Sequence, residues 1–266
     1  MASGERLFVQ AIRRYCAGHG VAVDVRAGGW LIAMRRGRTR HFAFGYDIGL
    51  NGAIAHRLAN DKSATAEVLA LDGVPCVPHH RFLNPKLGKN VVGPSWRDAM
   101  LELLADHPQG VVVKPNEGTS GRSVFKVTTE AELDHAVSDV FAMSAGLVIS
   151  PYLAIEDEVR VVLLDDLPLV VYIKQRGKDW RHNLDAGAKP VLLADGEVRA
   201  ACVKLAADAA NAIGIVFASI DLVRVGGKWR VLEINSGVMM EALGKLHPEL
   251  VQATYDAALD RVFGEG

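Results

Sequence analysis

Residues 111–127 combine an apolar stretch, a lysine at its end and a loop rich in glycine and hydroxyl groups. Glycine permits backbone conformations in which successive N–H groups turn toward an anion, and Lys114 adds a positive charge. The loop residues that could contact a phosphate are Gly118, Thr119, Ser120, Gly121 and Ser123. The segment predicts a phosphate-binding loop, and a flexible hairpin tip is the alternative interpretation.

This loop differs from the strand–loop–helix P-loop. It lacks the pattern G-x-x-x-x-G-K-[ST], and the apolar alternation that follows Gly121 has the period of a strand. We therefore expect two strands joined by a glycine-rich loop.

A second candidate for chemistry is residues 219–237, where two antiparallel strands are expected around a Gly-Gly turn. Glu233 and Asn235 are two positions apart, so both side chains leave the same face of one strand. Asp221 can face them from the neighbouring strand. Such oxygen ligands beside a triphosphate suit magnesium. A solvated sheet face is the alternative, but an unpaired charge in so apolar a strand would be costly.

The chain carries a lysine, a glycine-rich loop, a hinge and a D…LEIN hairpin in this order. This arrangement resembles the ATP-grasp superfamily. The similarity runs from Asn60 to Gly237 and includes ligases that add glutamate to a ribosomal protein, glutathione synthetases and cyanophycin synthetases. It implies an α+β ATP-grasp fold, in which two α+β lobes bind ATP between them, preceded by a short amino-terminal α/β unit. The implied boundaries are 1–57, 58–150 and 151–266.

The resemblance also implies how the nucleotide is held. Lys62 matches the first phosphate-binding lysine, and Lys114 matches the second, on the α- and β-phosphates. Residues 149–153 match the hinge whose backbone holds the adenine edge, with Ser150 and Pro151 in place of the usual Gln or Glu. The implied nucleotide contacts are Lys62, Lys114, Gly118, Thr119, Ser120, Gly121, Ser150, Tyr152, Leu153, Glu158 and Leu232.

The segment EDEVRVV resembles the family's D-x-R strand. This match makes Glu158 the acceptor for the ribose hydroxyls, with Glu156 and Asp157 as alternatives. It also makes Arg160 a cation that faces the reacting phosphate.

The segment KQRGKDWRHNL resembles the loop R-x-x-x-G-D-F-R-x-N-L. Arg181 and Asn183 then become candidates for holding the γ-phosphate and the carboxylate that it activates, and they join Arg160 as implied catalytic residues. Lys174 and Arg176 compete for one matching position.

Asp221, Glu233 and Asn235 fall on the family's magnesium ligands, which implies two Mg²⁺ ions, with Mn²⁺ as an alternative metal. Residues 236–238 replace the S-P-G that usually follows the asparagine. This replacement lies on the acceptor side, so it bears on substrate identity more than on ATP binding.

The implied reaction is ATP-dependent carboxylate–amine ligation. The γ-phosphate passes to a carboxylate, an amine attacks the acyl phosphate, and ADP and phosphate leave, with an amino acid or a small peptide as one substrate. A kinase on the same fold and a nucleotide-binding module without turnover are the alternatives. Because the amino-terminal unit is short, either the lobes hold a small substrate, or a second subunit, partner or carrier completes the acceptor site.

Composition is that of a soluble enzyme. The 266 residues are 50% hydrophobic and 23% charged, with a net charge of −1. This charge gives no global attraction to nucleic acid or anionic membranes, and no apolar run has the length of a membrane span. The cysteines at 16, 76 and 202 follow no metal or redox spacing, so we expect a cytoplasmic protein.

Four arginines at positions 35, 36, 38 and 40 surround an expected hairpin turn. A solvated basic turn is the first interpretation, and a docking patch for an acidic substrate or carrier is the alternative.

Periodicity predicts the remaining elements. Asp61 and Ser63 are possible helix caps, and Met239, Met240 and Glu241 either line an acceptor pocket or pack in the core. Helices are expected near 6–19, 53–71, 97–105, 130–143, 199–213 and 248–263, and strands within 21–44, 159–164 and 169–174.

Overall fold

Three antiparallel sheets, each with helices on a face, make up the described part of the chain. The computed structural model describes residues 4–87, 96–118, 123–175 and 188–264. Its helices are α1 (Leu7–Gly18), η1 (Ala27–Gly29, 3₁₀), α2 (Ala53–Asn60), α3 (Lys62–Leu71), α4 (Trp96–Asp106), α5 (Glu130–Met143), α6 (Glu197–Ile213), α7 (Glu241–Gly244) and α8 (Pro248–Phe263). Its strands are β1 (Ala22–Arg26), β2 (Leu31–Arg36), β3 (Thr39–Phe44), β4 (His80–Leu83), β5 (Val111–Pro115), β6 (Phe125–Val127), β7 (Gly146–Pro151), β8 (Asp157–Leu164), β9 (Leu167–Gln175), β10 (Lys189–Leu192), β11 (Phe217–Val225) and β12 (Lys228–Asn235).

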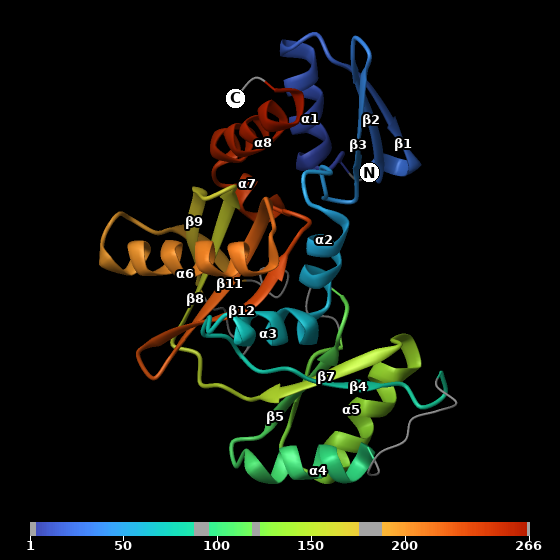
Figure 1. Cartoon of the computed structure of the whole chain (residues 1–266), viewed down its shortest axis with the longest axis vertical. Helices are drawn as coiled ribbons and strands as arrows, with labels where there is room; N and C mark the ends of the chain where they lie inside the picture. Colours follow the sequence, from blue (N-terminus) through green and yellow to red (C-terminus); the bar gives the residue numbers. More distant parts are fainter. Residues whose placement is uncertain (1–3, 88–95, 119–122, 176–187, 265–266) are drawn as a thin grey trace.

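The amino-terminal unit packs against the last helix of the chain. Strands β1, β2 and β3 form a sheet in that order, and α1 lies beside α8 although the two belong to opposite ends of the sequence (Figure 1). Phe8, Ile12 and Tyr15 of α1 are buried in one hydrophobic core with Tyr255 of α8, and the rings of Phe8 and Tyr255 are 5.2 Å apart. Residues near the two ends of the described chain therefore share one core.

The five-stranded sheet has the order β10-β9-β8-β11-β12. Helix α6 covers one face, and its buried side chains, among them Cys202 and Leu205, pack on Val159, Val161 and Ile220. The β11–β12 hairpin turns at two glycines with positive φ, Gly226 and Gly227, as the sequence predicts.

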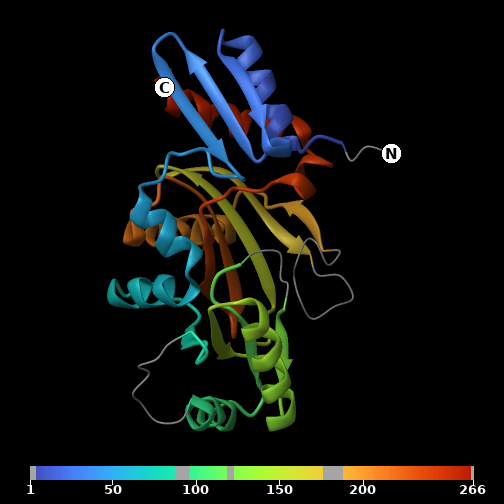
Figure 2. The same cartoon turned by 90° about the vertical axis from the view of Figure 1, so that its right-hand side faces the viewer.

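The other face of this sheet is divided between apolar and polar side chains. Along β8, Glu158 and Arg160 share that face with Val162 and Leu164 because strand side chains alternate. The apolar half joins the core beneath α1 and α8. The polar half is turned toward the four-stranded sheet, which lies below it in Figure 2.

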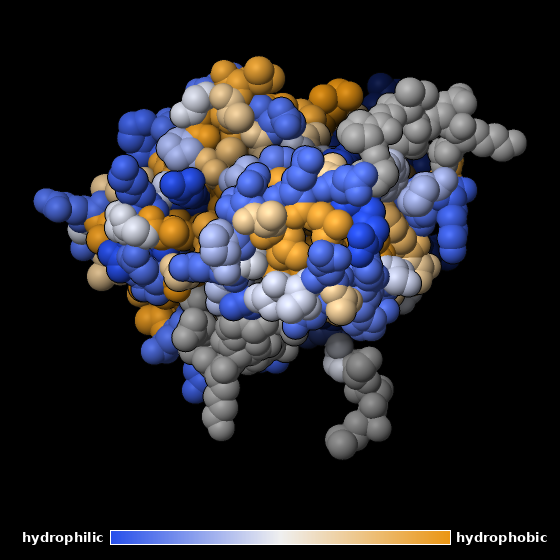
Figure 3. Space-filling model, turned by 90° about the horizontal axis from the view of Figure 1, so that it is seen from below, coloured by the Kyte–Doolittle hydropathy of each residue, from blue (hydrophilic) through white to orange (hydrophobic). Residues whose placement is uncertain are grey.

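The four-stranded sheet has the order β4-β7-β5-β6, with α4 and α5 packed on its outer face. Thr129 caps α5 in a capping box with Glu132, and Leu133, Ala136 and Val140 are its buried residues. Figure 3 looks at this end of the molecule and shows apolar side chains among hydrophilic ones. The inner face of the sheet is left to face the polar half of the larger sheet.

The single helix expected over residues 53–71 is wrong, because two helices occupy this stretch. Asp61 interrupts them with extended backbone angles, and its side chain accepts a hydrogen bond from the Ala64 N–H of α3 at 2.9 Å. Ser63 is not a cap, since its hydroxyl donates to Asp61. A short acidic side chain that can bond local backbone N–H groups favours such a break.

Two further expectations can be compared with the fold. The hairpin that carries the arginine cluster is present, but Arg36 turns inward, bonds the Phe263 carbonyl and lies over its ring, 5.2 Å from the centroid. The three cysteines are free thiols.

Among the described residues, no helix has the length and apolar character needed to cross a membrane.

Candidate active site

The centre of the polar half-face is an ion cluster on three adjacent strands. Arg160 of β8 donates two hydrogen bonds to Asp221 of β11, at 2.7 and 2.6 Å. Lys174 of β9 reaches the same carboxylate at 2.8 Å and Glu158 at 2.6 Å. All four residues are at least nine-tenths buried, and Asp221 is fully buried. Their register explains the cluster, because Asp221 pairs with Arg160 across β8 and β11.

Burial and pairing set the charge states of this cluster. Burial alone would raise the pKa of the Asp221 carboxyl, but Arg160 and Lys174 outweigh burial and hold that pKa well below its ordinary value. Burial raises the pKa of the Glu158 carboxyl and is only partly offset by Lys174. Asp221 is thus the fixed negative charge that holds two buried cations.

Glu233 and Asn235 complete the expected oxygen set on β12. Glu233 is the cross-strand partner of Asp221, and Asn235 is the partner of Ser219. Both side chains are half-buried, and the Asn235 amide donates to the Glu233 carboxylate at 3.5 Å. The structure therefore brings the three predicted ligands together, with Asp221 turned toward Arg160 and Lys174.

Helix α3 and the end of β5 bring two lysines to the opposite side. The backbone N–H of Lys62 bonds the Asn116 carbonyl at 3.3 Å, and its ammonium group donates to the Gly118 carbonyl at 2.9 Å. Asn116 also accepts the N–H of Ser63 at 3.1 Å, which holds the start of α3 on the end of β5. Lys62 is consequently anchored at the beginning of the glycine-rich loop.

Lys114 is a buried cation on the inner face of the four-stranded sheet, 8% exposed. Burial, assisted by Lys62, lowers the pKa of its ammonium group to about 8, although Glu233 and Glu158 oppose this shift. A buried lysine with this pKa gains stability when an anion binds beside it.

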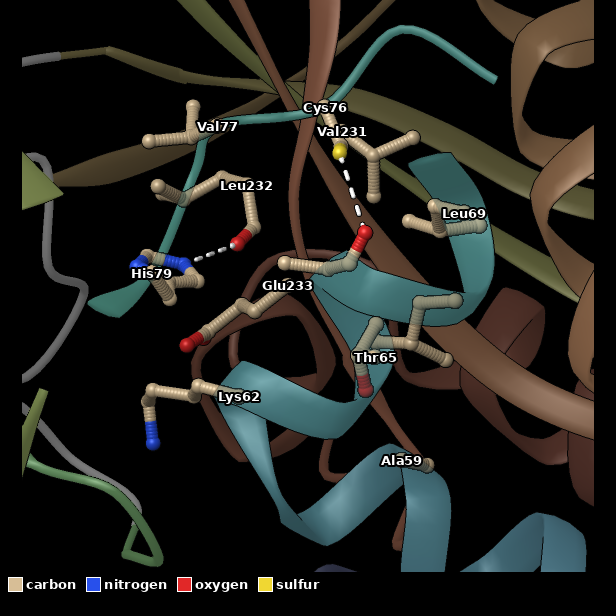
Figure 4. Close-up of a pocket in the computed structure, with 12 residues that line it drawn as sticks. Ala59, Lys62, Thr65, Leu69, Cys76, Val77, His79, Val231, Leu232 and Glu233 are labelled. Atoms are coloured by element: carbon tan, nitrogen blue, oxygen red, sulfur yellow. Dashed lines mark hydrogen bonds between the residues drawn. The ribbon is translucent and has the colours of Figure 1, made fainter. Parts of the chain in front are cut away.

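Residues of α2, α3, the segment that precedes β4, and β12 line a small pocket that we call the interlobe pocket, drawn in Figure 4. Glu233 and Lys62 extend toward the same side of it, from β12 and α3 respectively (Figure 4). The residues of the interlobe pocket used below are Lys62, His79, Leu232 and Glu233.

The segment expected to be the hinge joins β7 to β8. Ser150 is 4% exposed, and the Tyr152 N–H bonds the Gly110 carbonyl at 3.0 Å. The Lys126 ammonium lies 3.6 Å from the centre of the Tyr152 ring, and Leu153 follows at the half-buried end of the segment.

Each of the three acidic candidates for the ribose has a cationic partner. Glu156 and Asp157 both pair with Arg224, and Glu156 also accepts the N–H of Gly227. Glu158 is the partner of Lys174 and lies deeper. The ribose assignment remains a prediction.

Several predicted site residues lie outside the described residues. In the glycine-rich loop they are Thr119, Ser120 and Gly121, and in the later loop they are Arg176, Arg181 and Asn183.

A model of the RimK-like ATP-grasp domain matches residues 59–248. The chain belongs to the RimK-like ATP-grasp domain family. This finding confirms the resemblance and the α+β ATP-grasp fold expected from the sequence, and it places both facing sheets within one recognised domain.

Named relatives of this RimK-like ATP-grasp chain are ligases. The chain is 25% identical to "Probable alpha-L-glutamate ligase 2" of Shewanella frigidimarina over 86% of its own length and 73% of the relative. It is 30% identical to the D-alanine–D-alanine ligase of Desulforudis audaxviator over 70% of its length and 61% of the relative. The chain also spans 61% of the alpha-L-glutamate ligase homologues of Legionella pneumophila.

Solved structures agree on the fold. The D-alanine–D-alanine ligase of Bacillus anthracis superposes with a TM-score of 0.60 at 19% identity, covering 81% of this chain and 72% of the other. The bifunctional glutathione synthetase of Pasteurella multocida gives a TM-score of 0.56 at 14% identity, covering 92% of this chain and 44% of the other.

The donor set of this RimK-like chain suits a hard cation such as magnesium. Two carboxylates and an amide oxygen come from Asp221, Glu233 and Asn235. Within the described ranges, no group of three or more His, Cys, Asp or Glu side chains is arranged to hold a metal. Asp221 Oδ1 accepts one hydrogen bond, from Arg160, and Oδ2 accepts two, from Arg160 and Lys174. Glu233 and Asn235 therefore fit as the principal ligands, with Oδ1 of Asp221 as the third.

Sequence reasoning left two buried polar residues of this site without a firm role. Lys174 and Arg176 compete for one matching position. Lys174 is a charged residue in an apolar strand and lies opposite Glu158, and this position favours Lys174 as the match. His79, 6% exposed in the interlobe pocket, was not singled out. Its position depends on contacts between segments far apart in the sequence, so no local pattern marks it.

Proposed function

We propose that this chain is an ATP-dependent carboxylate–amine ligase that forms an amide or peptide bond through an acyl phosphate and releases ADP and phosphate. The observation that carries the proposal is the pair of facing polar surfaces within a RimK-like ATP-grasp domain. One surface presents Lys62 and Lys114, and the other presents the buried cluster of Arg160 with Asp221 and Glu233 beside it.

The two lysines would hold the phosphates. Lys62 is fixed at the start of the glycine-rich loop, and Lys114 is buried with a pKa of about 8. A polyphosphate beside Lys114 would restore its full charge and offset part of the cost of burial. Backbone N–H groups of the loop that begins at Gly118 would add neutral donors to the same phosphates.

Arg160 and Lys174 would neutralise charge on the transferring phosphoryl group. Both are held by Asp221, so their positions are fixed before substrate arrives. Preorganised cations of this kind stabilise a transition state without reorganising at the moment of reaction. Arg181 and Asn183 remain proposed contacts to the γ-phosphate and the carboxylate.

Magnesium, when bound, would supply positive charge that neutralises the phosphate oxygens. Glu233 and Asn235, with Asp221 behind them, would hold it. On the nucleotide side, Leu232 and the hinge residues Ser150, Tyr152 and Leu153 would hold the base.

The substrates are proposed to be a small carboxylate and a small amine, with an amino acid or peptide as one of them. The named relatives act on glutamate or D-alanine according to their names. This chain spans 61–73% of the length of those relatives. A second copy or a carrier that completes the acceptor site is part of the proposal.

ADP release from ATP and magnesium, measured with pooled amino acids and dipeptides, tests this function. Stoichiometric phosphate release and an amide product detected by mass spectrometry are the expected result. ADP release accompanied by a phosphorylated hydroxyl compound would instead identify a kinase and contradict ligation.

A further inference from the structure

His79 carries a buried ring nitrogen without a partner. The side chain is 6% exposed, and no described residue bonds its Nδ1 atom. An unpaired polar atom in such a place is uncommon in folded proteins and calls for a partner that the described residues do not supply.

The other ring nitrogen fixes the tautomer. His79 Nε2 lies 3.3 Å from the Leu232 carbonyl oxygen, drawn as a dashed line in Figure 4. A carbonyl can only accept, so Nε2 carries the hydrogen. Burial, followed by the charges of Lys114 and Lys62, keeps the pKa of the ring well below its ordinary value, so the ring is neutral. Nδ1 is therefore an unprotonated acceptor.

Strand register places this acceptor at the hinge end of the four-stranded sheet. His80 pairs with Ile149 across β4 and β7, so the preceding residue, His79, lies beside Ser150. Ser150 in turn pairs with Val112 of β5. Lys114 is two residues farther along β5 on the same face, roughly 7 Å away along the strand. The acceptor and the phosphate-binding lysine thus occupy different positions along one face.

We propose that His79 is a specificity residue whose Nδ1 accepts a hydrogen bond from the exocyclic amine of the nucleotide base. This inference rests on the proposed function, because it takes the face of the four-stranded sheet that carries Ser150 and Lys114 as part of the nucleotide site. A purine with a 6-amino group donates to Nδ1. A purine with a 6-oxo group instead places oxygen lone pairs against the lone pair of Nδ1. The neutral ring could donate from Nδ1 only by moving its hydrogen from Nε2, which would break the hydrogen bond to the Leu232 carbonyl.

The experiment compares ADP with inosine diphosphate, a 6-oxo analogue, by titration calorimetry with magnesium. The wild-type protein is expected to prefer ADP by about tenfold or more, since an unpaired buried acceptor is costly. His79→Gln places an amide near Nε2 and leaves no acceptor at Nδ1, so this preference should nearly vanish. His79→Asn places an amide oxygen near Nδ1, so the preference should persist.

Controls separate this role from a structural one. His80 is exposed on the opposite face, so His80→Gln and His80→Asn should leave the preference unchanged. His79→Asn loses the hydrogen bond to the Leu232 carbonyl, so its Tm should be lower than that of His79→Gln. The preference for ADP should follow the opposite order, because it persists in His79→Asn and nearly vanishes in His79→Gln. A merely structural histidine would make stability and preference change together.

The remaining outcomes are also decisive. If wild-type protein binds ADP and inosine diphosphate equally, or if His79→Gln keeps the wild-type preference, the inference is wrong and the proposed function stands. If wild-type protein binds neither nucleotide, the proposed function itself fails, and the inference fails with it.

Discussion

Arg160 and Asp221 face each other across β8 and β11, and the guanidinium group donates two hydrogen bonds to the carboxylate at 2.7 and 2.6 Å. Lys174 shares the same carboxylate. A single buried anion therefore holds two cations, which makes Asp221 important for the fold.

Asp221→Asn tests this relationship. The substitution leaves Arg160 and Lys174 buried with less counter-charge, so the free energy of unfolding should fall by about 3–5 kcal/mol. Urea denaturation measures it. Asp208→Asn is the matched control, because Asp208 forms an exposed ion pair with Lys204 and its loss should cost no more than about 1 kcal/mol. Equal effects of the two variants would refute a structural role for Asp221.

Glu233→Gln should separate chemistry from stability. Glu233 is half-buried beside Asn235, so its neutral isostere should leave the free energy of unfolding within about 1 kcal/mol of wild type. Magnesium-dependent ADP release should be almost abolished because a metal ligand is weakened. Glu67→Gln, at an exposed position on α3, is the control. Wild-type turnover in Glu233→Gln would show that the metal assignment is incorrect.

Lys114 predicts a pH dependence of nucleotide binding. Burial lowers its pKa to about 8 in the free protein, and an anionic nucleotide binds the protonated form more tightly. Affinity for ADP should therefore be highest below pH 8, fall as pH rises through about 8, and be accompanied by proton uptake. Calorimetry in buffers of different ionisation enthalpy measures both quantities. Lys114→Met should bind more weakly with a flatter profile, and an unchanged profile would assign the titration to another group.

Glu241 links the two ends of the chain. Its carboxylate accepts the N–H groups of Leu7 and Phe8 at 3.0 and 3.4 Å and the Tyr46 hydroxyl at 3.2 Å. It therefore caps α1, which has no side-chain cap of its own. Glu241→Ala should lower the free energy of unfolding by about 1–2 kcal/mol. Glu249→Ala, in the exposed first turn of α8, should have a smaller effect, and equal effects would contradict the capping role.

Much of the fold could be predicted from local patterns. The helices at Glu130–Met143 and Pro248–Phe263 match their predicted ranges, because capping residues and a proline mark their starts. Asp61 was named as a possible cap, and it is the N-cap of α3. The break in the helix was nevertheless missed, because the apolar pattern continues through residues 53–71 and the docking of α3 on Asn116 is a contact between distant segments. The role of Glu241 was also left open, because its partners Leu7, Phe8 and Tyr46 lie 195 or more residues earlier in the sequence.

For the site, the sequence predicted which residue types would meet but not how they would pair. Asp221 and Glu233 are cross-strand partners, as the hairpin pattern indicates. The bonds from Arg160 and Lys174 to Asp221 depend on the register of β8 and β9, which belong to a distant hairpin. The family match confirms the resemblance, whereas the individual catalytic and binding roles remain predictions.

The central claim is carboxylate activation, and trapping with hydroxylamine tests it most directly. The protein is incubated with ATP, magnesium, pooled amino acids and dipeptides, and hydroxylamine, which converts an acyl phosphate into a hydroxamate. We expect hydroxamate in proportion to ADP with wild-type protein and almost none with Glu233→Gln. ADP release without hydroxamate, together with a phosphorylated hydroxyl product, would contradict the ligase account.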